Sequence, residues 1–142
     1  MNLFEFNQAK INTRGVLGFY SPGNKNVVIG DAAMNLTGRQ RGTLAVPTTH
    51  GVIAHEIGHA LSFHTQKGYR DVERAIRIAH QQFNRRNSNK LSRSDFVGSI
   101  SNYSRQSPHE TFAEAFADVR VNGAGAARAS QLIVKYWKGK GK

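Results

Sequence analysis

Residues 52–61 read Val-Ile-Ala-His-Glu-Ile-Gly-His-Ala-Leu, and this stretch decides how the chain folds. Pro-Thr-Thr at 47–49 precedes it, and a proline in the first turn with a threonine cap is typical of a helix start. We expect the helix to run to about Gln66 and Gly68 to terminate it. Most of its residues are uncharged, which is typical of a helix that is buried around a site.

The two histidines of this stretch, His55 and His59, are four residues apart and therefore lie on one face of the helix. Two imidazoles at this spacing can bind one zinc ion, with Glu56 between them as general base. A helix that buried these three groups without a metal would incur a large desolvation cost. The sequence therefore predicts a Zn²⁺ site, and chance occurrence of the motif on a surface helix is the alternative. Gly58 costs roughly 1 kcal/mol in a helix, so we expect a crossing backbone, such as a strand, beside it.

A catalytic zinc needs a third protein ligand and an open coordination position. His64 is the nearest candidate along the chain. However, this type of pattern requires a glycine three residues after His59, at position 62, and a third histidine six residues after His59, at position 65. Ser62 and Thr65 occupy those positions. His64 is therefore one residue out of register, and we expect it to be an ordinary residue at the helix end.

Glu110 and Glu114, one helical turn apart, are the other candidates. Ser107 and Pro108 start their helix with a cap and a proline at the first helical position. Ser107-x-x-Glu110 is also a capping box, in which the glutamate side chain reaches back to the cap amide. Spacing alone therefore leaves two interpretations of Glu110, as a metal ligand and as part of the cap.

Residues 101–116, Ser-Asn-Tyr-Ser-Arg-Gln-Ser-Pro-His-Glu-Thr-Phe-Ala-Glu-Ala-Phe, resemble the second motif of the anthrax lethal factor family of gluzincins, which includes the bacterial proline-proline endopeptidases. Members of that family place a tyrosine seven residues before a ligating glutamate, which a Phe-Ala-Glu-x-Phe segment follows. The resemblance covers roughly residues 15–121. It implies that Glu110 is the third zinc ligand, that Tyr103 is catalytic and donates to the oxyanion, and that Glu114 orients a ligand histidine.

Strand-like segments come before the helices, which predicts an α+β fold with a small N-terminal hairpin or sheet against the active-site helix and a mostly helical C-terminal half. With the resemblance, this is a zincin-like metallopeptidase domain. We expect one domain over residues 1–142, with an extension at 1–14 and a flexible basic tail at 138–142. The remaining expected elements are a hairpin of Val16–Tyr20 and Asn26–Ile29, a polar loop at 31–42, a third strand at Thr43–Val46, a helix carrying Val72 to Phe83, a loop at 84–94, a helix from Ser107 that ends at Gly123 and Gly125, and a helix at about Ala126–Trp137.

The net charge is +11, with 20 Lys and Arg against 9 Asp and Glu. Such a balance favours a nucleic-acid or acidic partner, and the cations are densest at residues 70–93 and in the tail. No nucleic-acid-binding motif accompanies them, so a solvated basic face is the alternative.

The chain has no cysteine, which excludes disulfides and thiolate ligands. No stretch approaches the roughly 18 apolar residues of a membrane span. No signal peptide is visible, which leaves the localisation open between the cytoplasm and delivery as part of a larger assembly.

These features together predict a zinc-dependent metalloendopeptidase that acts on a protein or peptide substrate. The edge of the hairpin at 16–29 would hold an extended peptide by β-augmentation. The alternative is a basic nucleic-acid-associated or phage-particle protein with a zincin fold, in which the protease activity is regulatory or lost.

Overall fold

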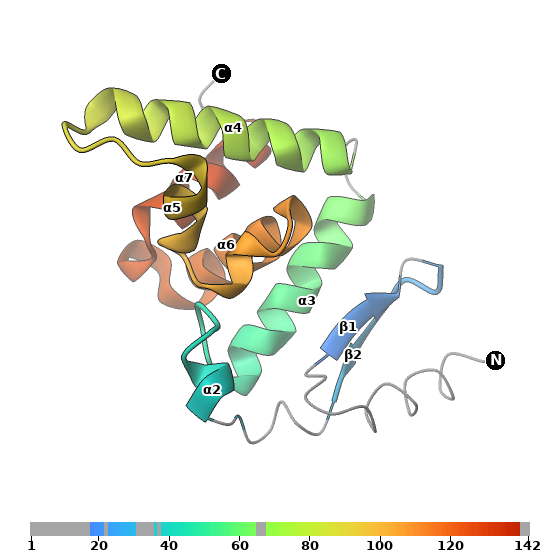
Figure 1. Cartoon of the computed structure of the whole chain (residues 1–142). Coiled ribbons are helices and arrows are strands. Elements are labelled where there is room, and N and C mark those ends of the chain that lie inside the picture. The colour runs from blue at the N-terminus through green and yellow to red at the C-terminus, as the bar shows by residue number, and fades with distance from the viewer. Residues whose placement is uncertain (1–17, 22, 31–35, 37, 65–67, 140–142) are drawn as a thin grey trace.

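Helices form most of the chain, and a two-stranded antiparallel sheet lies near its N-terminal end (Figure 1). The computed structural model describes residues 18–21, 23–30, 36, 38–64 and 68–139. The predicted combination of a hairpin with a mostly helical remainder is confirmed. The elements are β1 (Gly18–Ser21), β2 (Asn26–Ile29), α2 (Gly38–Arg41), α3 (Thr49–His64), α4 (Tyr69–Arg86), α5 (Arg93–Gly98), the 3-10 helix η2 (Tyr103–Arg105), α6 (Pro108–Asn122), the 3-10 helix η3 (Gly123–Gly125) and α7 (Arg128–Trp137).

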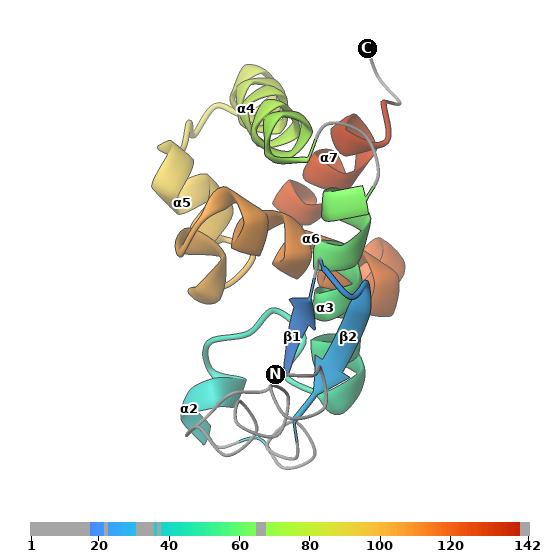
Figure 2. The ribbon, with the colours of Figure 1, turned by 90° about the vertical axis from the view of Figure 1, so that its right-hand side faces the viewer.

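The hairpin pairs β1 with β2 so that Gly18 lies opposite Ile29 and Ser21 opposite Asn26. Its turn includes Lys25, which has a φ of 55°. Both strands pack on α3, and Figure 2 shows the hairpin lying along that helix. The hairpin was predicted with one strand starting at residue 16. Residues 16 and 17, and the predicted extension at 1–14, lie outside the described residues.

Residues 43–46 form turns and bends, so the prediction of a third strand there is wrong. Their backbone instead contacts the helical half of the protein. The carbonyl of Thr43 accepts a hydrogen bond from the N–H of Tyr103 at 3.2 Å, and the N–H of Ala45 donates to the carboxylate of Glu114 at 3.0 Å. These groups are therefore not used in a strand ladder. The loop predicted at 31–42 also contains the short helix α2, with residues 31–35 and 37 outside the described part.

α3 and α6 cross at the centre of the molecule, and Gly58 lies at the crossing (Figure 1). A Cβ atom at Gly58 would lie 3.1 Å from Cα of Ala113 and 3.2 Å from Cβ of Phe116. The close approach expected at Gly58 is therefore made by a helix rather than by a strand. Thr48 caps α3 as predicted, since its hydroxyl accepts a hydrogen bond from the N–H of Gly51 at 3.0 Å, but Pro47 lies before the cap and not in the first turn.

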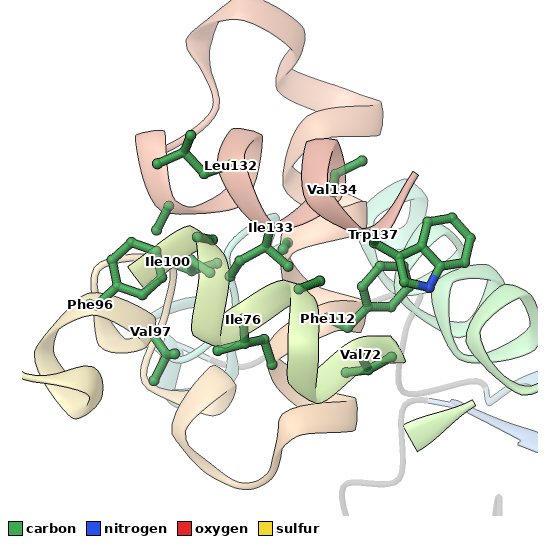
Figure 3. Close-up of a cluster of buried hydrophobic side chains, with 14 residues drawn as sticks. Val72, Ile76, Phe96, Val97, Ile100, Phe112, Leu132, Ile133, Val134 and Trp137 are labelled. Carbon is green, nitrogen blue, oxygen red and sulfur yellow. The ribbon is translucent and has the colours of Figure 1, made fainter. Parts of the chain in front are cut away.

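The main hydrophobic core lies between α4, α5, α6 and α7 (Figure 3). Ile76 of α4, Phe112 of α6 and Ile133 of α7 are fully buried in it. Full burial of a side chain of this size contributes about 1.5–3 kcal/mol, so α6 is held firmly by its Phe112 side. Glu110 and Glu114 lie two residues before and after Phe112, and an α-helix turns by about 200° over two residues. The core therefore directs the two carboxylates toward α3.

The loop predicted at 84–94 is shorter than expected, because α4 continues to Arg86 and α5 starts at Arg93. The hydroxyl of Ser92 accepts a hydrogen bond from the N–H of Asp95 at 3.1 Å and caps α5. A serine three residues before an acid is a helix-start pattern, but six residues are too few for an apolar period to be visible.

The C-terminal helices end and begin close to the predicted residues. Gly123, with a φ of 53°, follows the last residue of α6. The carboxylate of Asp118 accepts hydrogen bonds from the N–H of Ala127 at 2.9 Å and the hydroxyl of Ser130 at 2.7 Å, which fixes the start of α7. Within the described part of the chain, no helix combines the length and apolar character needed to cross a membrane.

Candidate metal centre

Two imidazoles from α3 and one carboxylate from α6 converge on one point. Oε1 of Glu110 lies 2.7 Å from Nε2 of His59, and its Oε2 lies 3.1 Å from Nε2 of His55. The two Nε2 atoms are 3.2 Å apart. The three residues offer ligand atoms that all lie within 4.8 Å of one another. This buried group could hold a metal ion.

The chemistry of these donors fits a divalent cation. Nδ1 of His55 lies 2.9 Å from Oε2 of Glu114. When the N–H at Nδ1 donates a hydrogen bond to that carboxylate, Nε2 of His55 presents a lone pair toward His59 and Glu110. Electron pairs from two imidazoles and a carboxylate at this separation repel one another unless a positive charge lies among them.

The pKa values of the site show the same need for positive charge. Burial opposes a charge on His55, but hydrogen bonds to Glu110 and Glu114 outweigh burial and raise the pKa of this imidazole to about 10. For Glu110, burial acts to raise the pKa, and hydrogen bonds from His55 and His59 overcome it and hold the pKa of the carboxyl well below its usual range. Without a metal, a protonated imidazole therefore stabilises the buried carboxylates.

Glu114 is held from three directions. Its Oε1 accepts hydrogen bonds from the N–H of Ala45 at 3.0 Å and from the hydroxyl of Ser101 at 2.8 Å, while its Oε2 faces His55. The residue is only 2% exposed. Because the three partners come from three different segments, they restrict the orientation of Glu114 and, through it, the orientation of the His55 ring.

Glu56 and Tyr103 border the same cleft, which has a volume of about 360 Å³. Oε2 of Glu56 is buried and has no hydrogen-bond partner among the described residues. Burial raises the pKa of this carboxyl, while the charges of His55 and His59 act to lower it. The ring of Tyr103 lies 5.7 Å from that of His55. Burial, followed by the charge of Glu110, raises the pKa of the Tyr103 hydroxyl, which keeps its proton at neutral pH.

Glu110 takes part in the cap through its backbone rather than through its carboxylate. Its backbone N–H donates to the hydroxyl of Ser107 at 3.2 Å, which is the cap expected at the start of α6. Its carboxylate points instead at His55 and His59. The cap therefore leaves the side chain available to the site. His64 is the last residue of α3, and its side chain lies outside the described part of the structure.

Several residues that line the cleft were not among the predicted site residues, although the hairpin at 16–29 was expected to hold the substrate. Gly18, Phe19 and Tyr20 of β1 line one part of it, and Phe63 and His109 line another. The rings of Phe63 and His109 stack with centroids 5.2 Å apart and an interplanar angle of 6°. Only the position of His109 next to Glu110 could have indicated its place, because stacking between α3 and α6 depends on the tertiary fold.

Gly18 allows β1 to approach α3 closely. A Cβ atom there would lie 2.7 Å from the carbonyl oxygen of Val28 and 3.4 Å from Cγ of Glu56. A larger residue would therefore push β1 away from its partner strand and from the cleft.

The structure brings together all of the residues predicted for the site: His55, Glu56, His59, Tyr103, Glu110 and Glu114. No protein-family model, curated protein or solved structure matches the chain.

Proposed function

We propose that this chain is a zinc-dependent metalloendopeptidase of the gluzincin type, with a zincin-like fold. The carrying observation is that the Glu110 carboxylate meets both imidazole Nε2 atoms beside a cleft that Glu56 and Tyr103 border. Two imidazole nitrogens and one carboxylate oxygen are a donor set of catalytic zinc, whereas structural zinc usually has four protein ligands. The open side of the cleft supports the catalytic type.

The residues of the cleft have complementary roles in amide hydrolysis. Bound zinc would supply a Lewis acid and lower the pKa of the attacking water. Glu56, whose Oε2 has no partner among the described residues, takes a proton from that water and delivers it to the leaving amine. Tyr103 is protonated at neutral pH, because its ordinary pKa of 10.0 is already far above 7 and its surroundings raise it further, so its hydroxyl donates a hydrogen bond to the developing oxyanion.

The hairpin offers a way to hold the substrate. β1 lines the cleft with Gly18, Phe19 and Tyr20, and it pairs with β2 along one edge. An extended peptide can add to a strand edge through backbone hydrogen bonds. A protein or peptide segment bound in this way would carry its scissile bond past Glu56.

Two measurements on the full chain test the proposal, namely the zinc content by mass spectrometry and the cleavage of a peptide library. The wild type should bind one zinc ion and cleave a subset of the peptides. Glu56→Gln should keep zinc and lose at least about 100-fold in rate, because general acid–base catalysis is worth roughly 10²–10⁴. Glu110→Ala should lose zinc affinity.

Glu73→Gln is a matched control, because it neutralises a carboxylate on α4 that does not line the cleft. It should leave zinc content and rate unchanged. Cleavage that persists in Glu56→Gln, or a wild type that binds no zinc, would contradict the proposal.

A further inference from the structure

Two surface hollows adjoin at the C-terminal end of α4. One lies along α4 and the loop that follows it, and the other lies between α4 and α7. Gln82 lines both hollows, and neither shares a lining residue with the metal cleft. α4 and α7 lie at the end of the molecule opposite the hairpin (Figures 1 and 2). We call the five cations that line the hollows the basic surface: Arg85, Arg86, Lys90, Arg128 and Lys135.

The basic surface is not neutralised by its own surroundings. All five cations are exposed, and no aspartate or glutamate is among the described residues that line the two hollows. None of the five forms an ion pair within the described part of the chain. Phe83, Leu132 and Tyr136 provide apolar lining between the cations.

Helix stability explains only part of this clustering. Arg85, Arg86 and Lys135 are in the last turns of α4 and α7, where a cation interacts favourably with the helix dipole. Arg128 is the first residue of α7, where the same dipole disfavours a cation. Lys90 lies in a loop outside any helix. The convergence of the five residues therefore requires another reason.

The exposed side of α4 extends the positive charge away from the basic surface. Arg70, Arg74 and Arg77 are exposed at helical spacing, on the side opposite the buried Val72 and Ile76. Like charges three or four residues apart destabilise a helix by about 0.2–0.5 kcal/mol per pair. A bound polyanion would relieve this repulsion.

Glu73, one of the two acidic residues of α4, already forms an ion pair with Arg93. The carboxylate of Glu73 accepts two hydrogen bonds from Arg93, at 2.6 and 2.7 Å. Glu73 is therefore bound mainly to Arg93 of α5, and of the three exposed arginines only Arg77 also lowers its pKa, so the charges of Arg70 and Arg74 are not offset by it.

We propose that the basic surface binds the phosphate backbone of a nucleic acid. Guanidinium groups bind phosphate in a bidentate manner, and three of the five cations are arginines. Tyr136 lies in the hollow between α4 and α7, and Nζ of Lys135 is 5.5 Å from the centroid of its ring. A cationic surface with an aromatic side chain is typical of sequence-independent binding to single strands. This favours a nucleic acid over an acidic polypeptide, which has no bases to stack.

Fluorescence anisotropy with a fluorescein-labelled oligodeoxythymidine, measured over a series of salt concentrations, tests this proposal on the full chain. The wild type should bind with a Kd of roughly 10⁻⁴–10⁻⁶ M near physiological salt, and more tightly at low salt. Arg86→Gln/Lys135→Gln should weaken binding at least about fivefold. The slope of log K against log salt should become shallower by about 1.4, because each lost phosphate contact removes about 0.7 for a single strand.

Lys25→Gln/Arg120→Gln is the matched control. It has the same net charge as the first variant, but its exposed positions are in the hairpin turn and at the end of α6. It should bind almost as the wild type does. Circular dichroism establishes that each variant is folded, and Lys90→Gln, in an exposed loop, provides a second variant with an expected loss of about one contact.

Three results would overturn the proposal. The first is the absence of binding between the wild type and the oligodeoxythymidine at low salt. The second is an equal loss of affinity in the control, which would mean that net charge alone attracts the probe. The third is tighter binding of labelled polyglutamate than of the oligonucleotide to the basic surface. That result would identify an acidic polypeptide as the occupant. None of these results depends on peptidase activity, because the two sites share no lining residue.

Discussion

Oε2 of Glu114 lies 2.9 Å from Nδ1 of His55, and this contact joins α6 to α3 beside the candidate metal centre. The same carboxylate accepts hydrogen bonds from Ala45 and Ser101. It therefore connects the orientation of one imidazole to the two loop segments that carry Ala45 and Ser101. Zinc affinity should depend on this residue even though it is not one of the three converging donors.

Glu114→Gln should lower zinc affinity by about 10–100-fold, as loss of a partner behind a ligating histidine does. The amide has only one oxygen to accept from Ala45, Ser101 and His55, so at least one donor is left unpaired. Titration against a competing chelator measures the effect. Glu73→Gln should leave the affinity unchanged, and unchanged affinity in Glu114→Gln as well would show that the ring of His55 is positioned without it.

Gly58→Ala should lower the free energy of unfolding by about 1 kcal/mol. The new Cβ would lie 3.1 Å from Cα of Ala113, and overpacking of this kind costs roughly 1–3 kcal/mol, against a gain of about 1 kcal/mol in helix propensity. Urea denaturation measures it. Gly125→Ala is the control, because a Cβ there would meet nothing within 4 Å. A stabilised Gly58→Ala would mean that α3 and α6 can separate at little cost.

Tyr103→Phe should bind zinc normally and lose about 10²–10³ in kcat, the usual effect of removing one oxyanion donor. The substitution keeps the ring that lies 5.7 Å from the ring of His55, so the site should remain folded. Steady-state kinetics on a peptide that the wild type cleaves gives the comparison. Tyr136→Phe removes a hydroxyl at α7 and should have full activity. Full activity in Tyr103→Phe would remove this tyrosine from the mechanism.

The pair of Glu73 and Arg93 should make stability depend on pH below neutrality. Hydrogen bonds from Arg93 outweigh burial and lower the pKa of Glu73 from its ordinary value of 4.5. The pair therefore stabilises the fold above pH 4.5, and this contribution is lost as the pH falls through the lowered pKa. Both side chains are about one third exposed or more, so we expect at most about 1 kcal/mol.

Arg93→Gln tests this prediction by denaturation at several pH values. The difference in free energy of unfolding between wild type and variant should be largest near pH 7 and should shrink in acid. Arg85→Gln removes a charge from α4 without breaking an ion pair of the described residues and should lack this pH dependence. A difference that is constant with pH would show that Glu73 does not titrate through this pair.

The longer helices could be predicted because their caps and apolar spacing are local properties. Val72 and Ile76 recur at helical spacing and do face the core, and Ser107 does cap α6. The strand predicted at residues 43–46 failed for a non-local reason. The backbone groups of its residues form hydrogen bonds with Tyr103 and Glu114, which lie about 60 to 70 residues away in the chain.

The site was predictable to the extent that its residues belong to short motifs. His55, Glu56 and His59 follow from one helical spacing. The roles of Tyr103, Glu110 and Glu114 were assigned from a family resemblance, and these roles stay predictions. The partners of Glu114 and the stacking of His109 on Phe63 depend on how α3 and α6 cross, which no local pattern encodes.

That crossing also determines when the centre can form during folding. α3 contributes both imidazoles, but the carboxylate that meets them is 51 residues further along, beyond α4 and α5. A nascent chain that has completed α3 therefore has only two of the three candidate ligands. The third joins them after α6 docks, so metal uptake by the proposed site would report late long-range assembly rather than early helix formation.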